Sequence, residues 1–482
     1  MPESSSVCQR GKRSQLAKDQ NDFQPLSIAE AKEFSYAPFL LDVPSFLHPH
    51  HRQYWLELPD VQQLIRHSSS CPSSICHLLT TPEAEGDREE GEEKDSAFLL
   101  TFDPNSYRKI AFWGQNYTRG EVTVVKNGVW RQDRPKLRWK SADLCDWNAD
   151  WRWIVPSTEE EGKEHKKRVA IKRKEKHVNR LILTATPESW SFQHWLDGLF
   201  PKLIQAWPWF RDGTWDVLGE GRMQPTTQKL WDTIGLHVPP STAAANYDSI
   251  LQEQQTVILV EDATTIFTAN EMLFPCVAPV YHPYLWHRMQ HELLVSHQYE
   301  AEEKGEEEDE GEGERNVVLY MSRGSEEDDE EEKGEEEVER KRTLKKMTRN
   351  KERTISNEKE LLQSIQQALL DRNLSEQLVL FDDLFSSLSS SSLSKLHNFL
   401  QKRVKALIGP HGGAFYNMRF CRRGTFIVEL LPKSRPVLTF WWEARLGGHR
   451  YWLLPVESDK EKGHQMKANV SDIYQLIRYH LF

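Results

Sequence analysis

The glycine-rich stretch Leu407–Asn417 limits the possible folds of this chain more than any other segment. An apolar run leads into Gly-Pro-His-Gly-Gly-Ala, and this order predicts a strand, a tight turn and the start of a helix. Such a turn presents backbone N–H groups at a helix N-terminus, where the helix dipole favours negative charge. Gly412 and Gly413 would let a ligand approach the backbone without a Cβ in the way. The turn therefore fits a pyrophosphate group, but turn chemistry alone explains its glycines equally well, because parallel α/β proteins in general have glycine turns between strand and helix.

Strands and helices are expected to alternate around this turn, from residue 316 to the C-terminus. The apolar patterns predict strands over 316–321, 377–381, 425–431 and 451–455, with helices over 357–371, 393–404, 441–446 and 470–481 between and after them. Alternation of this kind is typical of a parallel sheet covered on both faces. Nucleotides bind such sheets at the carboxyl ends of the strands, which is where the glycine turn lies.

The part of the chain before residue 316 is expected to contain a β-rich region over 97–153 and a helix over 189–207. Thr186 and Pro187 are expected to begin this helix as its N-cap and first residue, and its apolar residues form one broad stripe. His194 and Asp197 are three residues apart and so share one side of the helix. By themselves they fit a buried structural histidine and a carboxylate with a neighbouring partner better than they fit a catalytic pair, and the glycine turn makes the two interpretations about equal.

Charge is concentrated in runs along this chain. The 482 residues carry a formal net charge of −11, which argues against a general nucleic-acid binder because such a protein needs a basic face. Acidic or mixed-charge tracts predict a linker over 291–315 and a disordered insertion over 324–352, and residues 1–96 are expected to be poorly ordered. No apolar run reaches about 18 residues and the N-terminus is polar, so neither a secretory signal nor a membrane anchor is visible.

Four segments, in order, resemble glycosyltransferase family 61 of the eukaryotic type. They are the His194-x-x-Asp197 helix, the Ser322-Arg323 strand end, Arg353 to Asn357-Glu358, and the glycine turn continued through Asn417 to Glu429. The resemblance implies a GT-B fold, in which two Rossmann-like domains face a cleft. It places an acceptor-side domain over 97–290 and a nucleotide-sugar-binding domain over 316–482.

The resemblance also implies a reaction, in which a hexosyl or pentosyl group passes with inversion from a UDP-sugar to a hydroxyl of a glycan or glycoprotein. No Asp-x-Asp occurs in the sequence, so we expect neither a metal nor a cofactor, and a helix N-terminus with a cation would hold the diphosphate. Asp197 is the first candidate for the base and His194 the second; their roles could be reversed, or the pair could only position the acceptor. The residues expected to bind the donor are Arg323, Arg353, Asn357, His411, Gly412, Gly413, Ala414, Asn417 and Glu429.

The resemblance also bears on the location of the protein in the cell and on its functional class. The family implies the lumen of the Golgi or endoplasmic reticulum, with membrane association left open, and three Asn-x-Ser/Thr sequons at Asn116, Asn373 and Asn469 support it weakly. The alternative is a non-catalytic module that binds sugar nucleotides or glycans on the same fold. A dehydrogenase is disfavoured, because no Gly-x-Gly-x-x-Gly follows a predicted strand with an acidic residue about 20 positions on.

Overall fold

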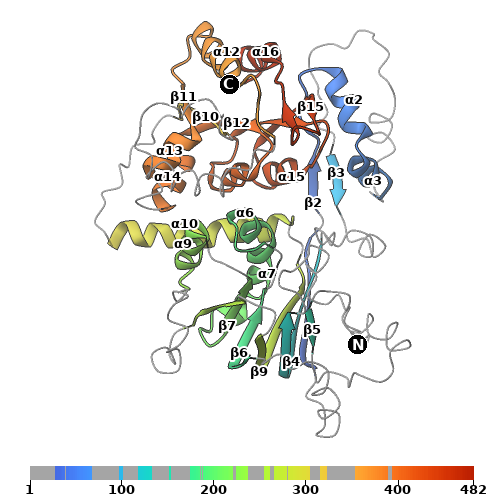
Figure 1. Ribbon diagram of the computed structural model, residues 1–482, viewed down its shortest axis with the longest axis vertical. Coiled ribbons are helices and arrows are strands. Elements are labelled where there is room, and N and C mark those ends of the chain that lie inside the picture. The colour runs from blue at the N-terminus through green and yellow to red at the C-terminus, as the bar shows by residue number, and fades with distance from the viewer. Residues whose placement is uncertain are drawn as a thin grey trace. The chain divides into compact units, whose positions relative to one another are not determined.

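The computed structural model describes residues 28–37, 39–67, 97–100, 118–132, 151–153, 174–184, 186, 188–220, 224–236, 255–260, 265–278, 281–303, 315–322, 353–388 and 393–481. The chain forms two compact units (Figure 1). Unit 1 comprises Met1–Phe39 and Leu100–Glu300, and unit 2 comprises Leu40–Leu99 and Ala301–Phe482. The expected insertion over 324–352 lies outside the described residues.

Unit 2 is built on a fully parallel five-stranded sheet, as the alternating pattern predicts. Its strands stand in the order β11 (Gln377–Leu380), β10 (Val317–Tyr320), β12 (Val404–Pro410), β13 (Phe426–Pro432) and β14 (Arg450–Val456). The helices are α12 (Glu358–Asp371), α13 (Phe381–Leu388), α14 (Leu393–Arg403), α15 (Thr439–Leu446) and α16 (Val470–Tyr479). Buried apolar side chains on nearly every strand explain why both faces need a helical cover.

The strand order reverses between β10 and β12. From β10 the chain moves outward to β11, and it then returns to the other side of β10 to continue through β12, β13 and β14. A crevice opens at the carboxyl edge of such a reversal because the connections on its two sides leave over opposite faces of the sheet. Gly409 permits the close strand contact here, since an added Cβ would lie 2.8 Å from the carbonyl oxygen of Met321.

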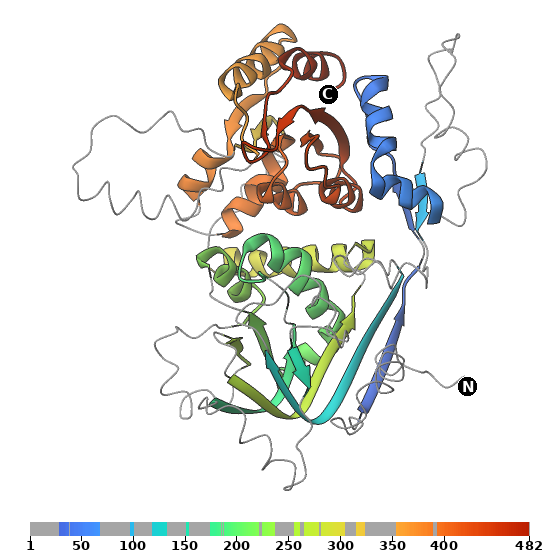
Figure 2. The same ribbon diagram turned by 45° about the vertical axis from the view of Figure 1, so that its right-hand side comes forward.

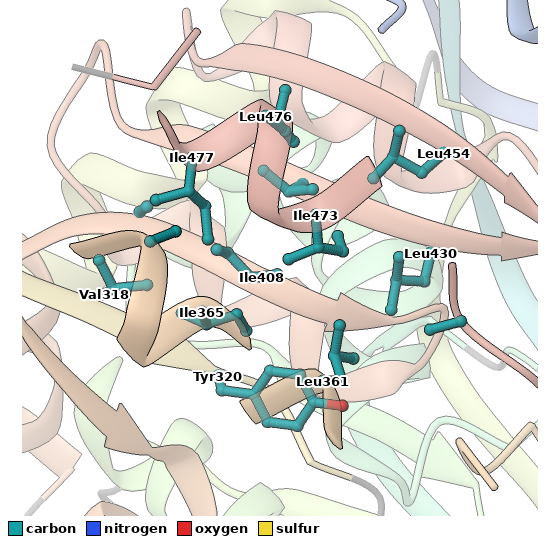
Figure 3. Close-up of a cluster of buried hydrophobic side chains, with 14 of the residues drawn as sticks. Val318, Tyr320, Leu361, Ile365, Ile408, Leu430, Leu454, Ile473, Leu476 and Ile477 are labelled. Atoms are coloured by element: carbon teal, nitrogen blue, oxygen red, sulfur yellow. The ribbon is translucent and has the colours of Figure 1, made fainter. Parts of the chain in front are cut away.

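Two helical layers cover the two faces of this sheet. Helices α12 and α16 pack over one face, where their side chains join alternate residues of the strands in one buried cluster (Figure 3). Members of this cluster include Tyr320 from β10 and Ile408 from β12. Helices α14 and α15 lie on the other side, together with the helix that follows the glycine turn (Figure 1). The glycine turn and α12 therefore border the crevice from opposite faces.

An N-terminal segment completes unit 2. After the short strand β2 (Phe39–Asp42), which pairs with β3 (Ala97–Leu100), come the helices α2 (Pro49–Glu57) and α3 (Pro59–His67). Ser45 pairs in parallel with Trp452 at the free edge of β14, and the buried Trp55 ring meets Trp441 edge-on at 5.3 Å between centroids. The sequence predicts a poorly ordered region over 1–96, with docking of the aromatic residues of 36–80 left open; in the structure 40–67 buries aromatic side chains against the rest of unit 2.

His449 makes the stability of unit 2 depend on pH. The residue is buried, its Nε2–H donates to the carbonyl of Met418 over 3.0 Å, and burial lowers its pKa from 6.5 to about 4. The folded state thus favours the neutral ring, so the stabilisation is complete above pH 6.5 and is lost as the pH falls from 6.5 toward 4. We expect about 2 kcal/mol of unfolding free energy to be lost between pH 7 and pH 5 through this one group.

Urea unfolding of the full chain at pH 7 and pH 5 measures this loss. His449→Asn keeps a donor toward Met418 but does not titrate, so its stability should fall by about 2 kcal/mol less than that of the parent chain over the same interval. The exposed His480, replaced in His480→Asn, is the matched control and should leave the loss unchanged. Equal losses in all three proteins would contradict the assignment.

Unit 1 contains a mixed sheet that is only partly Rossmann-like. Its path runs β1 (Ile28–Ser35), β4 (Arg119–Gln132), β9 (Thr265–Val277), β6 (Lys174–Leu183), β7 (Asp216–Glu220) and β8 (Val257–Val260), with β5 (Trp151–Trp153) on β4. β6 pairs in parallel with both β9 and β7, and β7 with β8, whereas β4 runs antiparallel to its neighbours. The long strands β4 and β9 lie side by side, and the helices after β6, β7 and β9 lie together on one side of them (Figure 2).

The helix predicted over 189–207 is present in pieces: α6 (Phe192–His194), a π-helical turn η3 (Trp195–Leu199), α7 (Phe200–Gln205) and α8 (Trp207–Phe210). The N–H of Phe200 donates to the carbonyl of Trp195, one residue further back than in an α-helix. Pro201 supplies the reason, because it has no N–H to pair with the Asp197 carbonyl. The broad apolar stripe is buried as predicted.

Two predicted boundaries differ from the structure. The N-cap of α6 is Ser191, whose side chain accepts from the N–H of His194, rather than Thr186. Helix α10 (Pro283–Glu303) extends into the predicted linker of 291–315, because buried residues such as Leu293 continue its apolar face. At its start, His282 accepts the N–H of Tyr284. In the described part of the chain no helix is long and apolar enough to cross a membrane.

Candidate functional site

The glycine turn follows β12 at the reversal of the unit 2 sheet. β12 ends at Pro410, and a 3₁₀-helix, η5 (Gly413–Phe420), follows instead of the expected α-helix. Gly412 is extended, with φ 179°, so its conformation does not require glycine. By helix geometry the N–H groups of Gly413 and Ala414 have no partner inside the helix, whereas that of Phe415 donates to the Gly412 carbonyl over 3.0 Å. Those of Gly413 and Ala414 remain suited to a phosphate group.

A chain of buried polar groups lies directly behind this turn. Glu429, fully buried on β13, accepts from Nδ1–H of His411 and from the hydroxyl of Tyr451 on β14. The imidazole of His411 also packs on Phe440, with ring centroids 4.8 Å apart. Burial, and then the carboxylate of Glu429, raises the pKa of Tyr451 well above its ordinary value, so the hydroxyl keeps its proton. These contacts fix the ring of His411 beside the turn.

A second pair of candidate side chains lies in unit 1. The Nδ1–H of His194 faces Oδ1 of Asp197 at 3.3 Å; the Asp197 side chain is fully buried, whereas that of His194 is 14% exposed. The π-helical turn that begins at Trp195 carries Asp197, and such turns occur often at functional sites. A buried carboxylate behind a partly exposed imidazole is an arrangement suited to general base catalysis.

The model of the family described as glycosyltransferase 61 matches residues 192–428. The chain belongs to glycosyltransferase family 61. It is therefore a glycosyltransferase in the general sense, which takes a sugar donor and a glycan acceptor. A search of the curated proteins found no match. The family match begins at α6, which carries His194, continues through η3 with Asp197, and ends in β13, one residue before Glu429.

Two asparagines among the residues expected to bind the donor form hydrogen bonds to the protein backbone instead. Asn357 precedes α12 and binds the backbone of Ala468 twice, donating to its carbonyl over 3.0 Å and accepting its N–H over 2.9 Å. Asn417 donates to the carbonyl of Ala414 over 2.9 Å and is buried. Asn357 thus ties the start of α12 to the segment before α16, and Asn417 holds the first turn of η5.

Two arginines, Arg323 and Arg353, are also expected to bind the donor. Arg323 lies outside the described residues. Arg353 has φ 65°, a region that long side chains rarely adopt, and its N–H donates to the carbonyl of Gly463 over 2.8 Å. The structure thus places the backbone of Arg353 beside the segment that follows β14.

Glu358 lies next to the reversal of the sheet and is not among the residues predicted from the sequence to bind the donor. It begins α12, and its carboxylate accepts from the hydroxyl of Ser322 over 3.3 Å, directly after β10. Burial, opposed by hydrogen bonds from Tyr320 and Ser322, raises its pKa. The sequence did contain a signal for this residue, because Glu358 is the second member of the Asn-Glu pair that carries the family resemblance. Only the asparagine of that pair was predicted to bind the donor. The structure distinguishes Glu358 from its neighbour, because its carboxylate contacts Ser322 directly after β10.

Glu188 is a second carboxylate beside His194. Its Oε2 lies 3.4 Å from His194 Nε2, and its backbone has φ 58°, which is unusual for a residue with a Cβ. Ser191 stabilises this turn, because its N–H and its hydroxyl both donate to the Glu188 carbonyl. His194 therefore lies between two carboxylates, one buried and one at the surface.

Among the residues that the structure describes, no group of three or more His, Cys, Asp or Glu side chains is arranged to hold a metal ion.

Proposed function

We propose that this family 61 protein is an inverting glycosyltransferase of GT-B architecture that uses a nucleotide sugar, a UDP-sugar, as donor and a hydroxyl of a glycan or glycoprotein as acceptor. The observation that carries the proposal is the glycine turn at the reversal of the parallel sheet, backed by the His411–Glu429 pair. Parallel sheets bind nucleotides at this position. The family's secretory setting supports the Golgi or endoplasmic reticulum as the location.

In the proposed reaction the turn holds the departing diphosphate. The N–H groups of Gly412, Gly413 and Ala414 donate to phosphate oxygens, and Arg323 supplies positive charge. His411 would contact the phosphate or the sugar, with its ring held by Glu429. The sequence lacks the Asp-x-Asp that would bind a divalent ion, so the proposal is metal-independent.

Burial supports His194 rather than Asp197 as the base. Asp197 is fully buried, and His194 is the group of the pair that retains exposed surface. We therefore assign His194 Nε2 as the base and Asp197 as the residue that positions its ring. The acceptor hydroxyl would replace the Glu188 carboxylate at Nε2 and give up its proton there. Its oxygen bonds to the anomeric carbon from one face while the bond to the phosphate oxygen breaks on the other, with the electron pair leaving on UDP.

A panel of UDP-sugars, offered to the full chain with simple glycosides and with or without EDTA, tests this function. We expect UDP release with one donor, unchanged by EDTA and reduced strongly in Arg323→Ala and in Asp197→Ala. Arg403→Ala is the matched control, since Arg403 precedes β12 at the opposite end of the sheet and donates to Asn316. It should leave release unchanged.

The result also separates the enzyme from a binding module. Nucleotide-sugar binding without UDP release, insensitive to Asp197→Ala, would assign a non-catalytic role. UDP release that stops with EDTA would overturn the metal-independent part of the proposal.

A further inference from the structure

Glu429 is not free to bind a ribose. Its side chain has no exposed surface, and its carboxylate already accepts from His411 and Tyr451. A nucleotide nevertheless carries a vicinal diol, and buried or half-buried carboxylates are strong acceptors for such hydroxyls. If a nucleotide occupies the crevice, another group must recognise the diol.

Glu358 is such a group. It begins α12, on the opposite side of the crevice from the glycine turn, and it is only half-buried. Ser322, which follows β10 at the sheet reversal, donates to its Oε1 over 3.3 Å and orients the carboxylate. An ionised carboxylate offers about four acceptor positions. With the hydroxyls of Ser322 and Tyr320 as donors, capacity remains for two further hydroxyls.

Charge separates the two borders of the crevice. The first turn of α12 carries Glu358 and Glu360, which repel a phosphate group. The glycine turn presents N–H groups of η5 and carries no acidic residue in its first turn. A diphosphate is therefore favoured at η5 and an uncharged, hydroxyl-rich group at α12.

We propose that Glu358, positioned by Ser322, is the specificity residue that accepts hydrogen bonds from a vicinal diol of the donor, and that this diol is the ribose of the nucleotide. The inference rests on the proposed function, since it assumes a nucleotide in the crevice. It assigns the sugar part of the nucleotide to α12 and the diphosphate to the glycine turn.

Calorimetric titration of the full chain with UDP and with 2′,3′-dideoxy-UDP tests this assignment. We expect the parent chain to bind UDP at least about tenfold more tightly than the dideoxy analogue, which corresponds to a hydrogen bond to a charged group. Glu358→Gln should weaken UDP about tenfold and leave the dideoxy analogue nearly unchanged. Ser322→Ala should weaken UDP by a smaller factor.

Glu360→Gln provides the matched control. It removes the same charge from the same helical turn at an exposed position. Electrostatics alone predicts that both Gln variants bind the diphosphate more tightly, because each removes a repelling charge. Diol recognition predicts weaker UDP binding for Glu358→Gln only, so the two explanations give opposite signs. Unfolding curves of both variants establish that they are folded.

Each outcome has one meaning. Unchanged UDP binding together with a specific loss of the UDP-sugar would transfer the contact to the diol of the transferred sugar and overturn the ribose assignment. Glu358→Gln that binds every ligand like the parent chain, or that loses UDP and its dideoxy analogue equally, would overturn the inference altogether. Failure of the parent chain to bind any nucleoside diphosphate would instead refute the proposed function.

Discussion

Replacing His194 by alanine is expected to lower kcat by about 10²- to 10⁴-fold, the range of a lost general base, and to leave the affinity for the donor unchanged. The physical reason is that His194 is the partly exposed member of its pair, with Asp197 fully buried behind Nδ1. Donor affinity should persist because the glycine turn belongs to the other unit. Initial-rate kinetics with the donor identified by the UDP-sugar panel, together with donor titration, measures both quantities.

Asp197→Asn and a surface control complete that experiment. The asparagine keeps the volume but no longer favours the Nδ1–H tautomer, so kcat should fall by at least about tenfold with the fold intact. His291→Ala changes a histidine of α10 whose side chain is 60% exposed and should leave kcat unchanged. Should His194→Ala retain most of its activity while Asp197→Asn loses it, the base would be Asp197, the first candidate from the sequence.

Replacing Glu429 by alanine is expected to lower the unfolding free energy by about 3–5 kcal/mol, as for other buried pairs that lose one partner. The substitution leaves two buried donors, His411 Nδ1–H and the Tyr451 hydroxyl, without their acceptor. The donor affinity should fall as well, because the ring of His411 loses the contact that orients it. Urea unfolding and donor titration on the same preparation measure the two effects.

Two variants with smaller expected losses of stability serve as comparisons. Tyr451→Phe removes only one of the two hydrogen bonds and should cost about 1–2 kcal/mol. Glu457→Ala breaks the surface pair with Lys433, in which Glu457 is 80% exposed, and should cost less than about 1 kcal/mol. A Glu429→Ala protein as stable as Glu457→Ala would show that the buried chain behind the turn does not stabilise unit 2.

Some residues were chosen for the site from sequence, and the structure gives them other partners. Asn357 and Asn417 bind backbone groups close by, so their side chains secure the start of α12 and the first turn of η5. A sequence motif names residues that occur together, but it does not distinguish a ligand contact from a support for the loop that makes it. Glu358 illustrates the converse, since its position at the sheet reversal emerges only once β10 and β12 are paired.

The amino-acid sequence by itself determined the alternating strands and helices after residue 316, the buried stripe before Trp207, and the family, because these depend on local periodicity and on short motifs. Only the tertiary structure decided that the strand order reverses at β10, that residues 40–67 belong with unit 2, and that Glu429 is enclosed by His411 and Tyr451. These features join side chains tens to hundreds of positions apart. The pairing of distant strands and the burial of polar groups are set by how the elements pack, and no local pattern encodes that packing.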